Sequence, residues 1–487
     1  MVVREVHKNL VLVIVAVAQF MVVLDTSIMN VALPSIYKAL HFTSEANLQW
    51  VVTAYTLAFG GFLLLGGRAA DLYGRKRTFV WSVSAFALLS LITGLSQNSA
   101  MIEITRAVQG LTAAFMSPAA LSIVLTTFRQ GKERAKALSV WGAVAAGGAA
   151  AGVLFGGLLT EYLDWRWNFF VNVPVGIAIA ILATRYVPES KADLDHNKLD
   201  LPGAVFGTGG LMLLVYAFSK APTYGWGSNR TLALLFGSIA LLAIFIFNEE
   251  RSRHALMPLN IFKVGNVAAA NLTVLPIVAS MFSMFFFVTL YMQLILHFSP
   301  LKTGLSFLPI PFVIGAVSVA MQHVVVRIGY KKPLVIAPLL MAGGIFWLSK
   351  IPVAGSYWKN VLPGLVIIAV GMGMSFISMT IAATNGVPVR ESGLASGLLN
   401  TAQQVGGSLG LAILSGIATS TTAAYFQTHA QTARQPLTQA AAQVAGFQHA
   451  LTVGACFGLL AAFIALVGLR QKRGEQIEAE GALASAA

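Results

Sequence analysis

The chain has 487 residues, of which 57% are hydrophobic and 10% charged, with a net charge of +14 and a mean hydropathy of +0.76. A soluble domain usually carries about 25% charged residues, so this composition excludes a water-facing surface and predicts an all-α integral membrane protein. The basic residues stand in short groups between apolar stretches, which indicates membrane topology rather than nucleic-acid binding. The single cysteine, Cys456, excludes an intramolecular disulfide framework and a CxxC metal site.

Long apolar stretches follow one another along the whole chain. A bilayer core of roughly 30 Å takes about 20 helical residues to cross, and on that measure we predict fourteen spans. They cover residues 10–36, 48–67, 79–97, 101–127, 138–160, 168–187, 201–218, 231–247, 267–291, 303–325, 333–350, 361–385, 394–417 and 447–469. The first stretch shows no small-residue cleavage site, so we interpret it as a retained helix and not as a signal peptide.

The basic residues predict the orientation. Of the 32 Lys and Arg residues, 23 fall in the N-terminal segment, every second loop and the C-terminal tail, and eight fall in the opposite loops. Positive charge marks the cytoplasmic side, so we expect both termini to be cytoplasmic. The start of the chain does not resemble an organelle leader, which favours a bacterial cytoplasmic (inner) membrane.

A weak internal repeat predicts the domain organisation. The segments "DLYGRKR" (71–77) and "VRIGYKK" (326–332) each follow the second span of a six-span block. We therefore expect a six-helix bundle over 1–187, an inserted two-helix hairpin with linkers over 188–265, a second six-helix bundle over 266–470 and a cytoplasmic tail over 471–487. Transporters built from such repeats place their substrate site between the repeats, near the membrane midplane.

Enzyme signatures are missing from the sequence. It has no Walker loop, HExxH, GxSxG or His/Cys cluster of metal spacing, so we expect no enzyme activity, no metal and no cofactor. The glycine-rich run "GAVAAGGAAAGVLFGG" (142–157) lies inside a predicted span. We interpret it as a stripe of small residues for helix packing, with Gly152, Gly156 and Gly157 at the contact.

Two charges inside predicted spans carry the most functional information. Asp25 lies deep in the first span and Arg106 lies in the fourth. A charge at the bilayer centre costs roughly 2.5–3.5 kcal/mol on insertion scales, so it tends to face a partner or a water-filled cavity. We expect Asp25 and Arg106 to form a proton-coupling site; a static ion pair is the alternative.

One basic loop carries an acidic residue that topology does not require. In "GGRAADLYGRKRTF" (66–79), Asp71 stands among glycines and four basic residues. We expect Asp71, Gly74, Arg75 and Lys76 to form a conformational latch, by pairing with another loop or capping a helix N-terminus. The alternative is that the loop serves topology alone.

Aromatic and amide side chains in the spans are candidates for the substrate site, although such residues are more often packed between helices or face lipid. The candidates are Asn30, Trp50, Tyr55, Phe59, Gln109, Asn172, Phe282, Phe286, Tyr291, Phe376, Asn400 and Gln404.

Five motifs in order resemble the fourteen-helix drug:proton antiporter branch of the major facilitator superfamily, over nearly the whole chain. They are "LDTSIMNVALP" (24–34), "GGRAADLYGRKR" (66–77), "RAVQGLTAA" (106–114), "WRWNFFVNVPVG" (165–176) and "SGLASGLLNTAQQVGGSLG" (392–410). The resemblance implies two six-helix bundles plus two inserted helices. It also links the arginine of the third motif, Arg106, to proton transfer. The fifth-helix motif of that branch departs here, because "GVLFGG" (152–157) has Val153 where a proline is expected.

Together these features predict a secondary transporter that exports hydrophobic or amphipathic compounds in exchange for protons by alternating access. Its partners would be small hydrophobic or cationic substrates, protons and the lipid bilayer; its energy source would be the proton gradient, and we expect a monomer. The alternatives are a narrower exporter of a metabolite, antibiotic or lipid, a uniporter, and a membrane-embedded lipid enzyme.

Overall fold

The structure is a computed structural model that describes residues 8–42, 45–128, 132–191, 199–252, 255–384, 386–387, 392–432 and 435–470. Every regular element within these ranges is helical. Thirteen helical segments of the described chain are long and apolar enough to cross a membrane. The helix Lys132–Tyr162, with 31 residues, supplies the length for the remaining predicted span. The predicted all-α membrane fold is confirmed.

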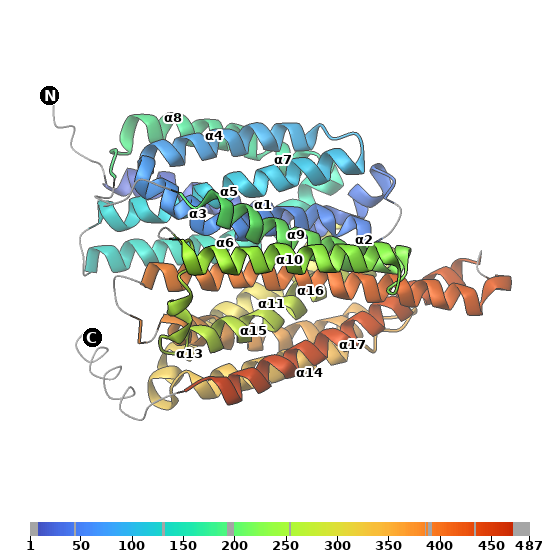
Figure 1. Cartoon of the computed structure of the whole chain (residues 1–487). Helices are drawn as coiled ribbons and strands as arrows, with labels where there is room; N and C mark the ends of the chain where they lie inside the picture. The colour runs from blue at the N-terminus through green and yellow to red at the C-terminus, as the bar shows by residue number, and fades with distance from the viewer. Residues whose placement is uncertain are drawn as a thin grey trace.

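The first half of the chain folds as one helical bundle (Figure 1). Its helices are α1 (Lys8–Ala39), α2 (Glu45–Leu48), α3 (Trp50–Tyr73), α4 (Arg75–Gly94), α5 (Ser99–Thr127), α6 (Lys132–Tyr162), α7 (Trp167–Phe170) and α8 (Asn172–Tyr186). Within it α3 packs on α5, α1 packs on α6, and α4 packs on both α5 and α8. The hairpin α9 (Leu201–Tyr224) and α10 (Asn229–Arg251) follows.

The second half repeats this arrangement. Its helices are α11 (Val267–Leu290), α12 (Pro300–Phe307), α13 (Pro309–Ile328), α14 (Lys331–Leu348), α15 (Leu362–Thr384), α16 (Ser392–Thr428) and α17 (Pro436–Gly468), with short irregular helical turns at Leu259–Lys263, Tyr291–Ile295, Tyr357–Val361 and Ala430–Thr432. The two bundles meet along two seams, one where α3 contacts α16 and one where α6 contacts α12 and α13. The hairpin covers the first seam, because α9 packs on both α3 and α16.

Two glycine turns reflect the internal repeat. Gly74 ends α3 at φ +113° and Gly329 ends α13 at φ +78°, backbone conformations that favour glycine. Both turns lie on the side of the molecule where α1 begins and α17 ends, on the left in Figure 1, which we call the terminal side. Each turn is held by the chain that leaves the last helix of its half. The Arg75 N–H donates to the Ser190 carbonyl (3.0 Å), and the Tyr330 hydroxyl donates to the Arg470 carbonyl (2.9 Å).

Other glycines set how closely the helices approach. A Cβ at Gly110 of α5 would overlap the carbonyl of Tyr55 in α3, so these two helices touch backbone to backbone. A Cβ at Gly156 would lie 2.8 Å from the Ile28 carbonyl oxygen of α1, and one at Gly157 would lie 2.8 Å from Leu301 Cα of α12. The side chain of Ser27 fills the space beside Gly152. The glycine run of α6 therefore lies at two helix contacts, as predicted, and with Val153 in place of proline α6 is one continuous helix.

Candidate functional site

Asp25 and Arg106 form a buried ion pair in the first bundle. Arg106 Nη1 donates to Asp25 Oδ2 at 2.5 Å, and the two residues are 1% and 0% exposed. The Arg106 Nε–H also donates to the Val51 carbonyl of α3 (3.0 Å), which the close α3–α5 packing brings within reach. The guanidinium lies over the Tyr55 ring, with Cζ 4.2 Å from the ring centre, a distance at which a cation and an aromatic face attract.

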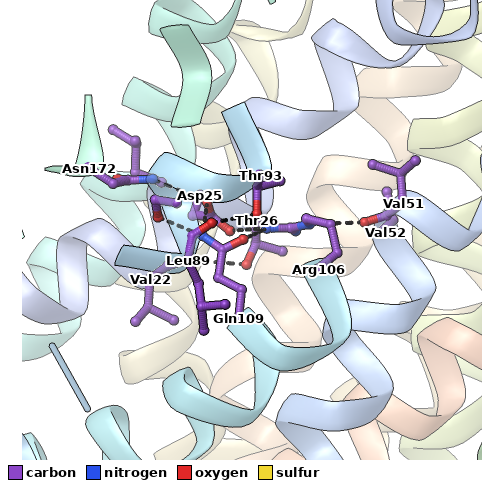
Figure 2. Close-up of polar contacts among 12 residues, drawn as sticks. Val22, Asp25, Thr26, Val51, Val52, Leu89, Thr93, Arg106, Gln109 and Asn172 are labelled. Atoms are coloured by element: carbon purple, nitrogen blue, oxygen red, sulfur yellow. Dashed lines mark hydrogen bonds and ion pairs between the residues drawn. The ribbon is translucent and has the colours of Figure 1, made fainter. Parts of the chain in front are cut away.

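Two amide side chains complete the coordination of the carboxylate. Gln109 Nε2 and Asn172 Nδ2 each donate to Asp25 Oδ1 at 3.2 Å. Gln109 also accepts a hydrogen bond from Arg106 Nη1 (2.8 Å) and donates to Ser90 Oγ (2.8 Å). Figure 2 shows Arg106, Gln109 and Asn172 pointing toward Asp25 from α5 and α8. Both carboxylate oxygens therefore accept hydrogen bonds, and such bonds help a buried ion pair to offset the loss of its water.

This network has a definite chemical consequence. An ionised Asp25 accepts three hydrogen bonds, whereas a protonated Asp25 would lose its ionic attraction to Arg106 and present a hydrogen to a set of donors. Proton binding at Asp25 thus requires the network to rearrange. A carboxyl group whose protonation is incompatible with one arrangement of its neighbours can couple protons to conformation.

A cavity of about 2390 Å³ lies between the two bundles. It is lined by α1, α3, α5 and α6 of the first half, by α11, α12, α13, α15 and α16 of the second, and by the end of α10 with the segment after it. At the terminal side it reaches five charged residues: Arg68, Asp71, Glu249, Glu250 and Lys263. The lining includes Thr26 but not Asp25, so the carboxylate of the ion pair faces the interior of its own bundle.

On the side away from the termini, polar contacts join the two halves. The Glu161 carboxylate at the end of α6 accepts from the Leu301 N–H of α12 (2.7 Å), and Gln293 Nε2 donates to the Val31 carbonyl (2.9 Å). On the hairpin seam, the Thr56 and Ser408 hydroxyls are hydrogen-bonded at 2.6 Å. The cavity thus extends to the terminal side, and on the other side contacts join the two halves.

The structure separates the twelve predicted substrate residues into two groups. Seven line the cavity: Asn30, Phe59, Phe282, Phe286, Phe376, Asn400 and Gln404. The other five lie outside the cavity lining: Trp50, Tyr55, Gln109, Asn172 and Tyr291.

Those five residues make contacts away from the cavity. Gln109 and Asn172 bind Asp25, and Tyr55 lies against Arg106. The Trp50 indole donates to Ser219 of the hairpin (3.0 Å), and the Tyr291 hydroxyl donates to the Pro352 carbonyl (2.7 Å). Three of the five thus belong to the ion-pair network, and the other two join separate segments of the chain.

The predicted latch loop is seen in one state. Arg75 pairs with Asp71 four residues earlier (2.8 Å), within the same turn. The role of helix cap, which sequence reasoning considered for Asp71, belongs to Glu189, whose carboxylate accepts from the N–H groups of Lys76 and Arg77 (both 3.1 Å). Sequence reasoning missed Glu189 because it lies in a polar segment that reads as a linker; its position just after a span and opposite a basic loop was the available signal.

The comparisons with known proteins agree with this architecture. Residues 15–411 match the family described as the Major Facilitator Superfamily. The chain belongs to this superfamily. Its members are transporters, so the chain is a transporter and not an enzyme.

Several curated relatives are resistance or export proteins. The chain is 40% identical to the puromycin resistance protein pur8 of Streptomyces alboniger, over 92% of this chain and 88% of that protein. It is 40% identical to the cephamycin export protein CmcT of Amycolatopsis lactamdurans, over 83% of each. It is 32% identical to the multidrug resistance protein Stp of Mycobacterium tuberculosis, over 85% of this chain and 76% of that protein.

Solved structures support the fold. A bacterial homologue of the human lysosomal transporter Spinster, crystallised in an inward-facing, occupied conformation, aligns with a TM-score of 0.67 at 14% identity, covering 96% of this chain and 97% of that one. The peptide-transporter family member PepTSo aligns with a TM-score of 0.64 at 15% identity, covering 94% and 96%.

Proposed function

We propose that this protein exports small hydrophobic or amphipathic drugs from the cell, in exchange for protons that enter through Asp25. The observation that carries the proposal is a fully buried, hydrogen-bonded Asp25–Arg106 pair beside a large cavity that extends to the terminal side. The relatives named for antibiotic resistance and export support the choice of drugs as cargo. The proton gradient supplies the energy, and no cofactor takes part.

The proposed orientation places both termini in the cytoplasm of a bacterial cell, with the protein in the cytoplasmic membrane as a monomer. The excess of Lys and Arg on the terminal side supports this orientation. The cavity is then open to the cytoplasm, where an exporter collects its substrate. The contact between Glu161 and Leu301 then lies on the external side, and Asp71, paired here with Arg75 of its own loop, would change partner to act as a latch when the cytoplasmic side closes.

In the proposed cycle, a proton from outside neutralises Asp25 and releases Arg106 from its ionic partner. Arg106 keeps the Val51 carbonyl and the Gln109 side chain as acceptors, so it stays within the bundle while Asp25 separates from it. Asp25 does not line the cavity, so the proton and the substrate bind on opposite faces of α1. Both shift the same equilibrium between two arrangements of the bundles. Proton binding is then coupled to substrate binding indirectly, through that equilibrium.

A narrower exporter is the second candidate. The two relatives at 40% identity are named for one antibiotic each, puromycin and cephamycin. An exporter of one host-made antibiotic would use the same cavity and the same ion pair, so the two candidates differ in substrate range and not in mechanism.

Inside-out vesicles with an imposed pH gradient test the proposal. Lipophilic cations, neutral drugs, puromycin and a cephamycin are offered in turn, and proton release from the vesicle lumen is recorded. We expect substrate-dependent proton movement with the native protein and none with Asp25→Asn, whereas Asp164→Asn, which removes an exposed carboxylate, should behave like the native protein. Flux that is independent of the gradient and unchanged in Asp25→Asn would show a uniporter.

A further inference from the structure

The inserted hairpin carries a second buried acidic pair, far along the chain from Asp25. Asp200 precedes α9 and Glu249 lies in the last turn of α10, so both stand at the terminal-side end of the hairpin. They are 5% and 3% exposed, although neither belongs to an ion pair in the described part of the chain. Carboxylates are rarely buried without a cationic partner, so this pair needs an explanation.

The hydrogen bonds of the two side chains leave one oxygen atom without a partner. Asp200 accepts from the Gly203 N–H (2.9 Å) and from Asn248 Nδ2 (3.0 and 2.8 Å to its two oxygens). Glu249 Oε2 accepts from the Met257 N–H (2.7 Å). Glu249 Oε1 is buried and accepts no hydrogen bond from the described residues, although the Leu256 backbone also faces the Glu249 carboxylate. A buried acceptor without a donor destabilises the folded state, and a charged acceptor does so more strongly.

The unpartnered oxygen points toward the other carboxyl group. A Cβ added to Gly203 would lie 2.6 Å from Glu249 Oε1 and 2.7 Å from Asp200 Oδ2, so both oxygens converge over the same glycine. Two ionised carboxylates are acceptors and have no hydrogen to share. Two like charges that face one buried point also repel each other, which favours a proton on one of the two groups.

A metal ion is a poor occupant of this position. The described residues contain no group of three or more His, Cys, Asp or Glu side chains that could hold one. Asn248 turns its amide hydrogens toward Asp200, and an amide hydrogen repels a cation. A proton satisfies both oxygens at once, needs no further ligand and fits over a glycine.

We propose that Asp200 and Glu249 share one proton and form a second proton-binding site at the cytoplasmic base of the hairpin. The site is distinct from Asp25, and neither of its readouts below depends on transport. Other charged groups nearby are Arg68, Asp71, Glu250 and Lys263, which line the same mouth of the cavity, and Arg251, whose guanidinium lies over the Phe247 ring at 4.0 Å.

The shared proton joins three segments. It links the start of α9 to the end of α10, and through Met257 it fixes the connecting segment that leads to α11. Loss of the proton places two negative charges against each other beneath that segment. The folded state then binds a proton that the unfolded chain releases near neutral pH, so stability is greatest at low pH and falls as pH rises.

Infrared spectroscopy of the purified full-length protein tests the site directly. We expect a protonated carboxylic acid band near neutral pH that disappears in Glu249→Gln and in Asp200→Asn. The band should persist in Asp25→Asn and in the matched control Glu250→Gln, which changes the exposed neighbouring residue at the same cavity mouth. An identical spectrum in Glu249→Gln and native protein would overturn the proposal.

Thermal unfolding across a pH series gives a second measurement. The native midpoint should fall as pH rises, and the Glu249→Gln midpoint should lack that slope, because the glutamine amide supplies a permanent hydrogen to Asp200. If Glu249→Gln does not fold, Asp200→Asn offers the same replacement from the other side. A native midpoint that depends on sodium or potassium at fixed pH, with no acid band, would show a bound cation and refute the shared proton.

Discussion

The Asp25–Arg106 pair can be tested as a free-energy coupling. Asp25→Asn keeps the size of the side chain but leaves Arg106, 1% exposed, with the Val51 carbonyl, Gln109 and the Tyr55 ring and no counter-charge. Removing one partner of a buried pair costs about 3–5 kcal/mol. Because asparagine keeps one carbonyl acceptor, we expect about 3 kcal/mol for Asp25→Asn, and a similar loss for Arg106→Gln, which leaves Asp25 with two amide donors.

The double variant Asp25→Asn/Arg106→Gln should lose far less stability than the sum of the two single variants. With both charges gone, no buried charge lacks a partner, so we expect a total cost of about 3–4 kcal/mol and a coupling of about 2–3 kcal/mol. The assay is reversible unfolding of the purified protein in mixed micelles, with the free energy of unfolding measured for all four proteins.

The exposed pair Asp164–Arg166, whose charged atoms are 3.6 Å apart, provides the matched control cycle. Its coupling should stay below about 1 kcal/mol. If the Asp25 and Arg106 single variants were additive within the error of the control cycle, the ion pair would not be the unit described above, and a proton at Asp25 would have no means of releasing Arg106.

Three further predictions concern packing, the external contact and the latch. Gly110→Ala should destabilise the protein by about 1–3 kcal/mol in the same unfolding assay, because its methyl group meets the Tyr55 backbone; Gly147→Ala, with open space at that position, should not. Glu161→Gln removes a negative charge from the N-terminus of α12, which should weaken the contact between α6 and α12 by about 1 kcal/mol. Spin-label distances between the ends of α6 and α12 should therefore lengthen. Unchanged distances would show that this contact does not hold the external side closed. Asp71→Asn breaks a partly exposed ion pair, so the free energy of unfolding should change by less than about 1 kcal/mol. If Asp71 is part of a latch, export in vesicles should nevertheless fall severely. Normal export would show that the loop only sets the membrane topology.

Sequence reasoning is strong where the signal is local. Each of the fourteen apolar stretches can be recognised from its own composition. The structure has helix over every one of them, in the predicted order. The repeat was also visible, because Gly74 and Gly329 align and both adopt positive φ. The pairing of Asp25 with Arg106 followed from the free energy of placing a charge in the membrane, since a charged residue in a span needs a partner.

The partners of that pair were harder to predict. Gln109 and Asn172 were assigned to the substrate, although both bind Asp25. Whether a polar side chain in a span faces the cavity or another helix depends on how that helix is rotated, and apolar surroundings on every side leave no periodic signal of rotation. Trp50 and Tyr291 lie outside the cavity lining for the same reason. The Val51 carbonyl, a backbone group, has no sequence signature.

The hairpin against α3 and α16 has a consequence for how lipid-soluble molecules reach the cavity. The seam between α3 and α16 has two layers, the α3–α16 contact itself and α9, which packs over it. The hydrogen bond between Trp50 and Ser219 links these layers. No helix of the described chain covers the seam between α6 and α12–α13 in this way, although Gly147 of α6 and Gly315 of α13 line the cavity with open space beside them. A compound dissolved in the bilayer therefore meets an added helical layer on one flank of the transporter and only the α6–α12 and α6–α13 contacts on the other.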